Sequence, residues 1–118
     1  MPNPVTHWEI SGKNAKKLHD FYTKLFGWEV NANNPMNYGL VDTHSKGGIN
    51  GGIPQSDQGK GVIIYVEVAD LKKQLAKAEK LGGRTIMPPT VVPNMVTFAL
   101  FSDPEGNVIG LVKSEEKK

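Results

Sequence analysis

The chain has 118 residues with 14 basic and 12 acidic side chains, so its net charge is +2. A nucleic-acid-binding domain usually has a much larger excess of basic side chains. The absence of cysteine excludes disulfides, thiolate zinc sites, iron–sulfur clusters and a cysteine nucleophile. No stretch approaches the roughly 18 apolar residues of a membrane span, and the first residues do not resemble a secretion signal. We therefore expect one compact cytoplasmic domain that binds neither nucleic acid nor a membrane.

The first half of the chain predicts a strand, a helix and three shorter strands. Val5–Ile10 is the first strand candidate, and apolar residues then recur at helical spacing from Ala15 to Phe26. Asn14 precedes this helix as its N-cap, and Gly27 follows it as a C-terminal glycine. Short strand candidates follow at residues 28–30, 38–41 and 48–53.

The second half repeats this order of elements. Gly61–Val68 has the β-branched composition of a buried strand, Asp70 is the N-cap of the next helix, and Gly82-Gly83 ends it. The apolar stripe of this helix consists of Leu71, Leu75, Ala78 and Leu81. Strand candidates follow at residues 84–87, 96–101 and 108–112.

A shift of 56 residues superimposes the two halves. It places Asn14 on Asp70 and Tyr22 on Ala78, so that the helices and their caps coincide. We interpret this match as an internal repeat within a single domain. The predicted first module spans about residues 4–54, the second about 61–113, and 114–118 is a flexible tail.

The repeat predicts an α+β fold of two tandem βαβββ modules. Each helix would cover one face of its own small sheet and leave the other face open. The open faces of the two modules would then enclose a groove, which is the usual form of a small-molecule site.

Several segments resemble the vicinal oxygen chelate superfamily, which includes glyoxalase I, bleomycin-resistance proteins and extradiol dioxygenases. They are His7-Trp8-Glu9-Ile10, Leu25-Phe26-Gly27-Trp28-Glu29-Val30, Tyr65 to Leu71, and Asp103-Pro104-Glu105-Gly106-Asn107. The resemblance runs from about Val5 to Val112. It implies the glyoxalase-like fold, a curved, half-open mixed β-sheet with the helices outside.

The resemblance also implies a divalent metal whose His, Gln or Glu ligands lie on the first and last strand of each module. Carried over to this chain, the first-strand positions fall on His7 and Ile63, and one last-strand position falls on Gly110. The remaining position lies within Asn50 to Gly52, where only the weak amide of Asn50 offers a donor. Three of the four positions therefore lack a good ligand, and we expect no metal and no cofactor.

Strand alternation assigns side chains to the groove, because every second residue of a strand points to the same face. The predicted ligand-binding residues are His7, Glu9, Asn50, Ile63, Tyr65, Phe101 and Gly110. They form an apolar and aromatic wall with a few polar groups. No nucleophile or oxyanion donor accompanies them in a recognisable arrangement, so the pattern names no catalytic residue.

Three functions remain open from the sequence. The first is a metal-free binding protein that holds a small, partly apolar molecule in the groove. The second is a metal-dependent lyase, isomerase or dioxygenase of the glyoxalase type. The third is an accessory or interaction module without a ligand. We expect a homodimer, because the edges of two short sheets need covering.

Overall fold

The structure is a computed structural model that describes residues 2–59, 61–93 and 96–114. It confirms the predicted α+β class and the repeated order of one strand, one helix and three strands. Within the described ranges, neither helix is long and apolar enough to cross a membrane.

The chain forms two compact units, which we name after their helices. The α1 unit spans residues 7–63. The α2 unit combines residues 1–6 with 64–118, so the start of the chain belongs to the second half of the fold. A backbone hydrogen bond of 2.8 Å, from Glu67 N to Pro4 O, joins these two segments.

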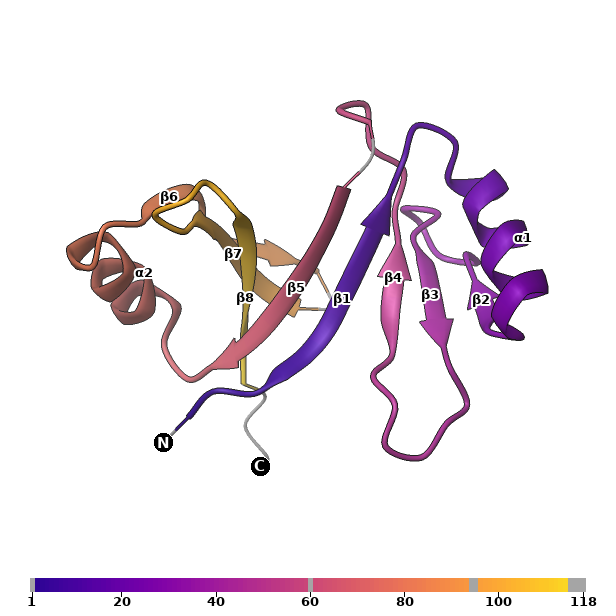
Figure 1. Ribbon diagram of the computed structural model, residues 1–118, viewed down its shortest axis with the longest axis horizontal. Coiled ribbons are helices and arrows are strands. Elements are labelled where there is room, and N and C mark those ends of the chain that lie inside the picture. The colour runs from indigo at the N-terminus through magenta and orange to yellow at the C-terminus, as the bar shows by residue number, and fades with distance from the viewer. Residues whose placement is uncertain (1, 60, 94–95, 115–118) are drawn as a thin grey trace. The chain divides into compact units, whose positions relative to one another are not determined.

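The α1 unit contains a four-stranded sheet with α1 against one of its faces (Figure 1). Its elements are β1 (Val5–Ser11), α1 (Ala15–Phe26), β2 (Glu29–Asn31), β3 (Gly39–Asp42) and β4 (Gly51–Ile53). The strand order is β2-β3-β4-β1, in which β1 and β4 are parallel and the other pairs are antiparallel. The sheet is therefore mixed, as expected.

The ends of α1 are set by the residues that the sequence predicts. The Asn14 side chain accepts a hydrogen bond from Lys17 N at 3.1 Å, which satisfies one of the free amides of the first turn. Gly27 ends the helix with φ of 75°, a left-handed conformation that a residue with a side chain rarely adopts. Phe26 is 56% exposed, so the last turn is less covered than its apolar stripe suggests.

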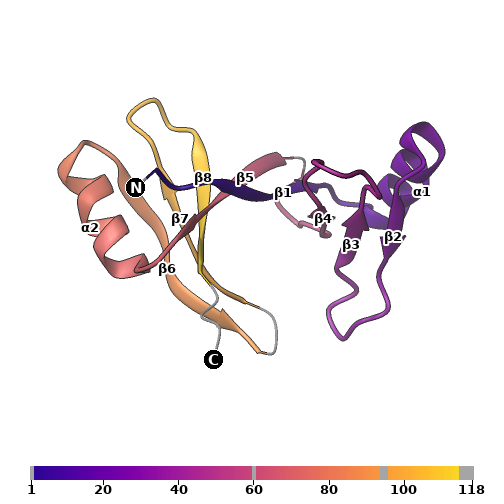
Figure 2. The same ribbon diagram turned by 90° about the horizontal axis from the view of Figure 1, so that it is seen from below.

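The α2 unit repeats the arrangement with longer strands (Figure 2). Its elements are β5 (Gly61–Val68), α2 (Leu71–Lys80), β6 (Arg84–Val92), β7 (Val96–Ser102) and β8 (Val108–Lys113). The strand order is β5-β8-β7-β6, with β5 and β8 parallel and the other pairs antiparallel. Only the last residues of β5, from Ile64, belong to this unit.

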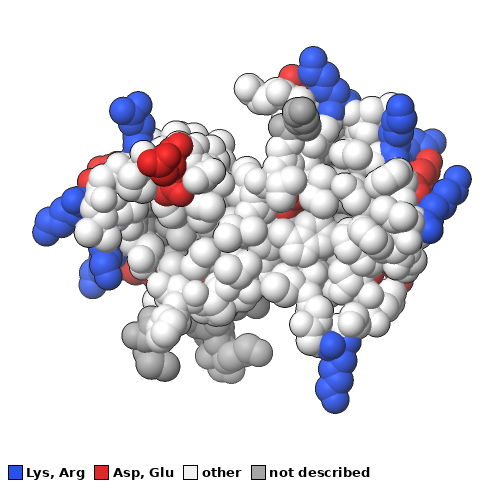
Figure 3. Space-filling model, in the orientation of Figure 1, with Lys and Arg blue, Asp and Glu red and all other residues white. Residues whose placement is uncertain are grey.

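The core of the α2 unit lies between α2 and its sheet. Its buried side chains are Val68, Leu71, Leu75, Ala99 and Leu111. Asp70 caps α2 by accepting a hydrogen bond from Lys73 N at 3.1 Å. Basic side chains project outward over α2 (Figure 3), which fits an amphipathic helix with one buried face.

The strand β6 is longer than the sequence predicts. The predicted strand ended at Met87. Pro88-Pro89 follows, and proline cannot donate a hydrogen bond to a neighbouring strand. The structure continues β6 to Val92 at the edge of the sheet, with register shifts between Thr85 and Met87 and between Met87 and Thr90. An edge strand tolerates proline because one side of it has no partner strand.

The predicted flexible tail is described only at its first residue. Ser114 donates two hydrogen bonds to Val68 O, from its backbone N at 2.7 Å and from its Oγ at 3.2 Å. This residue is therefore held to the end of β5. Residues 115–118 lie outside the described part of the chain.

Candidate functional site

The helix-free face of the α1 unit carries a hydrogen-bonded cluster of three side chains. His7 and Glu9 lie on β1, two residues apart, so both point to the face opposite Trp8. The hydroxyl of Tyr38, just before β3, donates to Glu9 Oε2 at 2.8 Å and lies 2.9 Å from His7 Nε2. All three side chains are half-buried.

The direction of these hydrogen bonds fixes the tautomer of His7. Tyr38 has a single hydroxyl proton, and in this arrangement it goes to the Glu9 carboxylate. His7 Nε2 must then be the donor toward the Tyr38 oxygen, which makes Nδ1 the basic nitrogen of the neutral ring. Burial lowers the pKa of His7 below its usual 6.5, and the nearby charge of Glu9 opposes this shift without cancelling it. The imidazole is therefore neutral at pH 7.

The ring of Tyr38 lies directly against the backbone of Gly52 on β4. A Cβ atom added at Gly52 would overlap the phenol of Tyr38. Gly52 pairs with Glu9 across the parallel β1–β4 ladder and with Leu40 on β3. Glycine at this position is thus what allows the phenol to cross the strand and reach both neighbours on β1.

The helix-free face of the α2 unit has the same contact between a tyrosine and a glycine. Tyr65 on β5 pairs with Gly110 on β8, and a Cβ at Gly110 would overlap the Tyr65 ring. Tyr65 is only 5% exposed. Its ring meets Phe98 of β7 edge to face, with a centroid distance of 6.5 Å. An aromatic surface therefore covers this part of the sheet.

The two glycines occupy equivalent places in the repeat. The shift of 56 residues places Glu9 on Tyr65, and their strand partners are Gly52 and Gly110. The resemblance implied a metal ligand at Gly110 and another within Asn50 to Gly52. The register locates the second position at Gly52, where the space for a side chain is filled by Tyr38.

The remaining predicted site residues lie elsewhere. Asn50 braces the loop before β4, because its Oδ1 accepts hydrogen bonds from Thr43 N at 2.9 Å and Thr43 Oγ1 at 3.2 Å. Ile63 is half-buried on β5, in the range of the α1 unit. The structure thus brings together His7 with Glu9, and separately Tyr65 with Gly110.

Phe101 was predicted to line the groove, but it lies on the other face of the sheet. Leu100 pairs with Gly110, and Phe101 therefore points to the opposite face of the sheet. There it packs against the core cluster beneath α2. The prediction did not include the antiparallel register between β7 and β8, which places Phe98 rather than Phe101 on the face of Tyr65.

These residues do not match the donor set that a divalent metal needs. Within residues 2–59, 61–93 and 96–114, no group of three His, Asp or Glu side chains lies close enough to hold an ion. His7 and Glu9 are instead linked through Tyr38, and Gly52 and Gly110 offer no side-chain donor. Metal ions of this kind require several oxygen or nitrogen ligands.

The contact between Tyr65 and Gly110 predicts a large cost for a single methyl group. We expect Gly110→Ala to lower the free energy of unfolding by about 1–3 kcal/mol, because the Cβ must displace a buried ring. Gly61→Ala is the matched control, since its Cβ would meet Ser11 Oγ at an ordinary 3.5 Å. Urea denaturation measures the free energy of unfolding of each variant. When Tyr65 is also replaced by Ala, Gly110→Ala should lower this free energy by less. Equal stability of the two single variants would contradict this packing.

The lowered pKa of His7 predicts a dependence of stability on pH. As the pH falls below 6.5, His7 becomes protonated in the unfolded chain more readily than in the folded chain, where its pKa is lower. The wild type should therefore lose stability, relative to His7→Gln, as the pH falls through 6.5 toward the lowered pKa of the folded state. His44, whose pKa is raised by Glu29, is present in both proteins and cancels in the difference. Parallel curves of unfolding free energy against pH would refute the prediction.

Comparison with known proteins identifies the family. The chain matches the family model described as Glyoxalase/Bleomycin resistance protein/Dioxygenase superfamily over residues 5–111. It is 36% identical over 50 residues to proteins of Mycobacterium tuberculosis and Mycobacterium bovis, both named "Putative glyoxylase CFP32". That match covers 42% of this chain and only 19% of those longer proteins.

Solved structures agree on the fold. A hypothetical protein of Bacillus halodurans superimposes with a TM-score of 0.73 at 14% identity, covering 100% of this chain and 99% of that one. Methylmalonyl-CoA epimerase of Mycobacterium tuberculosis superimposes with a TM-score of 0.65 at 16% identity, covering 95% of this chain and 88% of the epimerase. A variant of the Streptomyces coelicolor methylmalonyl-CoA epimerase, bound to 2-nitronate-propionyl-CoA, has a TM-score of 0.68 at 18% identity. This match covers 100% of this chain and 99% of that one. With the family model extending over almost the whole chain, these findings show that the protein belongs to the glyoxalase/bleomycin resistance protein/dioxygenase superfamily.

Proposed function

We propose that this protein is a metal-free member of its superfamily that binds a small, partly apolar molecule on the helix-free faces of its sheets. The observation that carries the proposal is the pair of glycines, Gly52 and Gly110, at strand positions where the family resemblance implies metal ligands. The space beside each glycine holds a tyrosine ring, which lies where a metal site would place a ligating side chain.

The chemistry of these faces favours a ligand with one polar group and an apolar body. In the α1 unit, His7, Tyr38 and Glu9 form a polar anchor within a half-buried surface. In the α2 unit, the half-buried Phe98 provides aromatic area beside the buried ring of Tyr65. Small-molecule sites combine such apolar lining with a few placed polar groups.

The charge of Glu9 limits the polar group of the ligand. A carboxylate at this anchor accepts hydrogen bonds and repels anions. A hydroxyl or amine donor on the ligand therefore suits this anchor better than a carboxylate or a phosphate. The proposal is of binding alone, and a homodimer remains part of it.

Metal addition tests the metal-free part of the proposal. We expect that Zn²⁺, Ni²⁺, Mn²⁺ and Fe²⁺, each added separately, leave the thermal unfolding midpoint unchanged, because a ligand that binds only the folded state would raise it. Elemental analysis of the purified protein should find no stoichiometric metal. A stoichiometric ion whose removal by chelator lowers the midpoint would favour the metal-dependent lyase, isomerase or dioxygenase instead.

A thermal-shift screen of small metabolites and aromatic compounds tests binding. We expect at least one compound to raise the midpoint of the wild type and to lose this effect in His7→Ala. His44→Ala is the matched control, since His44 lies on an exposed loop and pairs with Glu29 at 2.6 Å. Circular dichroism establishes that each variant is folded.

Three outcomes decide between the alternatives. Equal stabilisation of His7→Ala and wild type would remove the anchor from the proposal. A screen without any stabilising compound would favour the accessory or interaction module. Turnover of a stabilising compound by the metal-free protein would show that binding alone is too narrow a description.

A further inference from the structure

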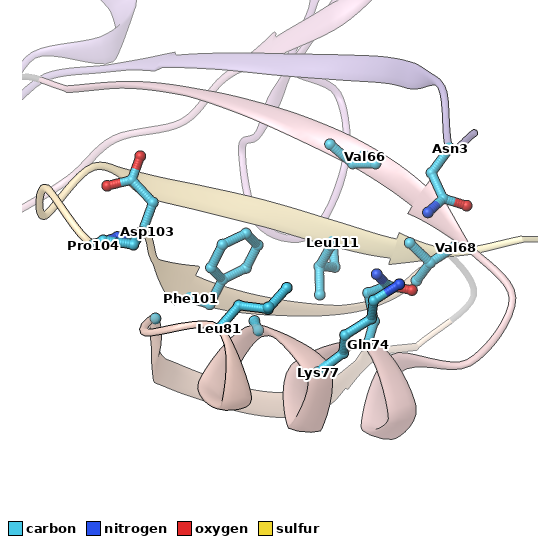
Figure 4. Close-up of a pocket in the computed structure, with 12 residues that line it drawn as sticks. Asn3, Val66, Val68, Gln74, Lys77, Leu81, Phe101, Asp103, Pro104 and Leu111 are labelled. Atoms are coloured by element: carbon cyan, nitrogen blue, oxygen red, sulfur yellow. The ribbon is translucent and has the colours of Figure 1, made fainter.

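A cavity of about 280 Å³ lies beneath α2, on the face of the sheet opposite Tyr65 and Gly110 (Figure 4). We call it the α2 cavity. It lies entirely within the α2 unit, and its lining comes from α2, the sheet and the first residues of the chain. Its apolar floor is formed by Val66, Phe101 and Leu111.

The α2 cavity exists because the apolar stripe of α2 becomes shallow toward its C-terminal end. Leu71 and Leu75 are buried against the sheet, but the next residue of the stripe is Ala78, whose side chain is a single methyl group. Leu81 follows and is 72% exposed, so it borders the opening without filling it. Over this last turn the helix therefore offers only the methyl group of Ala78 to the floor.

The other copy of the repeat has a large ring at the equivalent helix position. Tyr22 of α1 corresponds to Ala78, and its ring stacks on Trp28 with a centroid distance of 5.6 Å and an angle of 20°. It also stacks on Phe26 at 6.1 Å. The same helix position thus holds an aromatic ring in one unit and a void in the other.

The two ends of the α2 cavity differ in charge. Asn3, Gln74 and Lys77 lie toward the end near Val68, and Figure 4 shows their amide and ammonium groups gathered there. Asp103 lies at the opposite end. A cation and two amide donors therefore face one end of an apolar slot, and an anion faces the other.

The charge of Asp103 is held fixed by its turn. Its Oδ1 accepts hydrogen bonds from the backbone N–H groups of Glu105 and Asn107, both at 2.9 Å, and its Oδ2 accepts one from Asn107 Nδ2 at 3.0 Å. These bonds lower the pKa of Asp103, the Asn107 side chain contributing most. The carboxylate is thus ionised throughout the neutral range, and it repels a second anion from this end of the cavity.

We propose that the α2 cavity binds a short amphiphilic carboxylic acid. Its carboxylate lies against Lys77, Gln74 and Asn3, and its hydrocarbon chain lies on the half-buried Phe101 and Val66. The ammonium and amide groups are donors that suit a carboxylate. This site is distinct from the helix-free faces of the proposed function, and either can fail without the other.

The size of the α2 cavity limits the ligand to a short chain. Its volume of about 280 Å³ is just below the range of roughly 300–1,000 Å³ that small-molecule sites span. A long-chain lipid would therefore leave part of its hydrocarbon in water. Octanoate is therefore a suitable probe, with octanol as the neutral molecule of the same chain length.

Titration of the ¹⁵N-labelled protein with octanoate tests the proposal. We expect saturable shifts of the amide resonances of Gly83, Phe101 and Leu111, and weaker binding of octanol. Lys77→Gln should weaken octanoate binding about threefold to fivefold, as for a partly exposed ion pair. Lys73→Gln, on the same helix but outside the cavity lining, is the matched control and should bind as the wild type does.

Ala78→Leu is the decisive variant, because it fills the α2 cavity with another good helix former. We expect it to abolish the octanoate shifts while remaining folded by circular dichroism. His7→Ala should bind octanoate normally, which separates this site from the proposed function. Unchanged binding by Ala78→Leu, equal affinities of octanol and octanoate, or equal losses in the two lysine variants would overturn the proposal.

Discussion

The helix-free face of each sheet depends on a tyrosine ring lying against the backbone of a strand glycine. Tyr38 crosses Gly52 in the α1 unit, and Tyr65 crosses Gly110 in the α2 unit. Any larger residue at either glycine would displace the ring, because protein interiors have little spare volume. The hydrogen bonds of Tyr38 to His7 and Glu9 rely on this approach, and so does the aromatic surface around Tyr65. On both faces, a tyrosine ring therefore occupies the space beside the strand glycine.

The two copies of the repeat have the same order of helices and strands but differ in the side chains that pack between them. Both helices begin at a polar N-cap, and both sheets are mixed, with one parallel pair. On the helix side, Tyr22 of α1 stacks on Trp28, whereas the equivalent Ala78 of α2 lines a cavity. Equivalent positions of the repeat thus differ in side-chain size while the backbone arrangement is kept.

Most of the fold was predictable from the sequence, because local signals determine it. The helix caps Asn14 and Asp70 and the alternation of His7, Trp8 and Glu9 act within a few residues, and all were confirmed. The repeat and the family resemblance supplied the order of the elements. The bounds of the short strands were less accurate, as the extension of β6 past its prolines shows.

The site was less predictable, because it depends on register between strands that are distant in sequence. Alternation within β7 gives two possible faces for Phe101, and only its pairing with β8 decides between them. The role of Asn50 as a brace for Thr43 likewise depends on the shape of a loop. Spacing along the chain does not determine how the Tyr38 ring reaches Gly52, since Tyr38 precedes its strand.

The prolines of β6 have a consequence for assembly. An outer strand with exposed amides can recruit a foreign strand, and proteins guard against such templated growth. Pro88 and Pro89 have no amide hydrogen, and the irregular pairing around them distorts the margin of the sheet. This border is therefore a poor template for fibrils or for continuous sheet extension through a second molecule. Pairing with a second molecule has to use side-chain packing or another edge of the sheet.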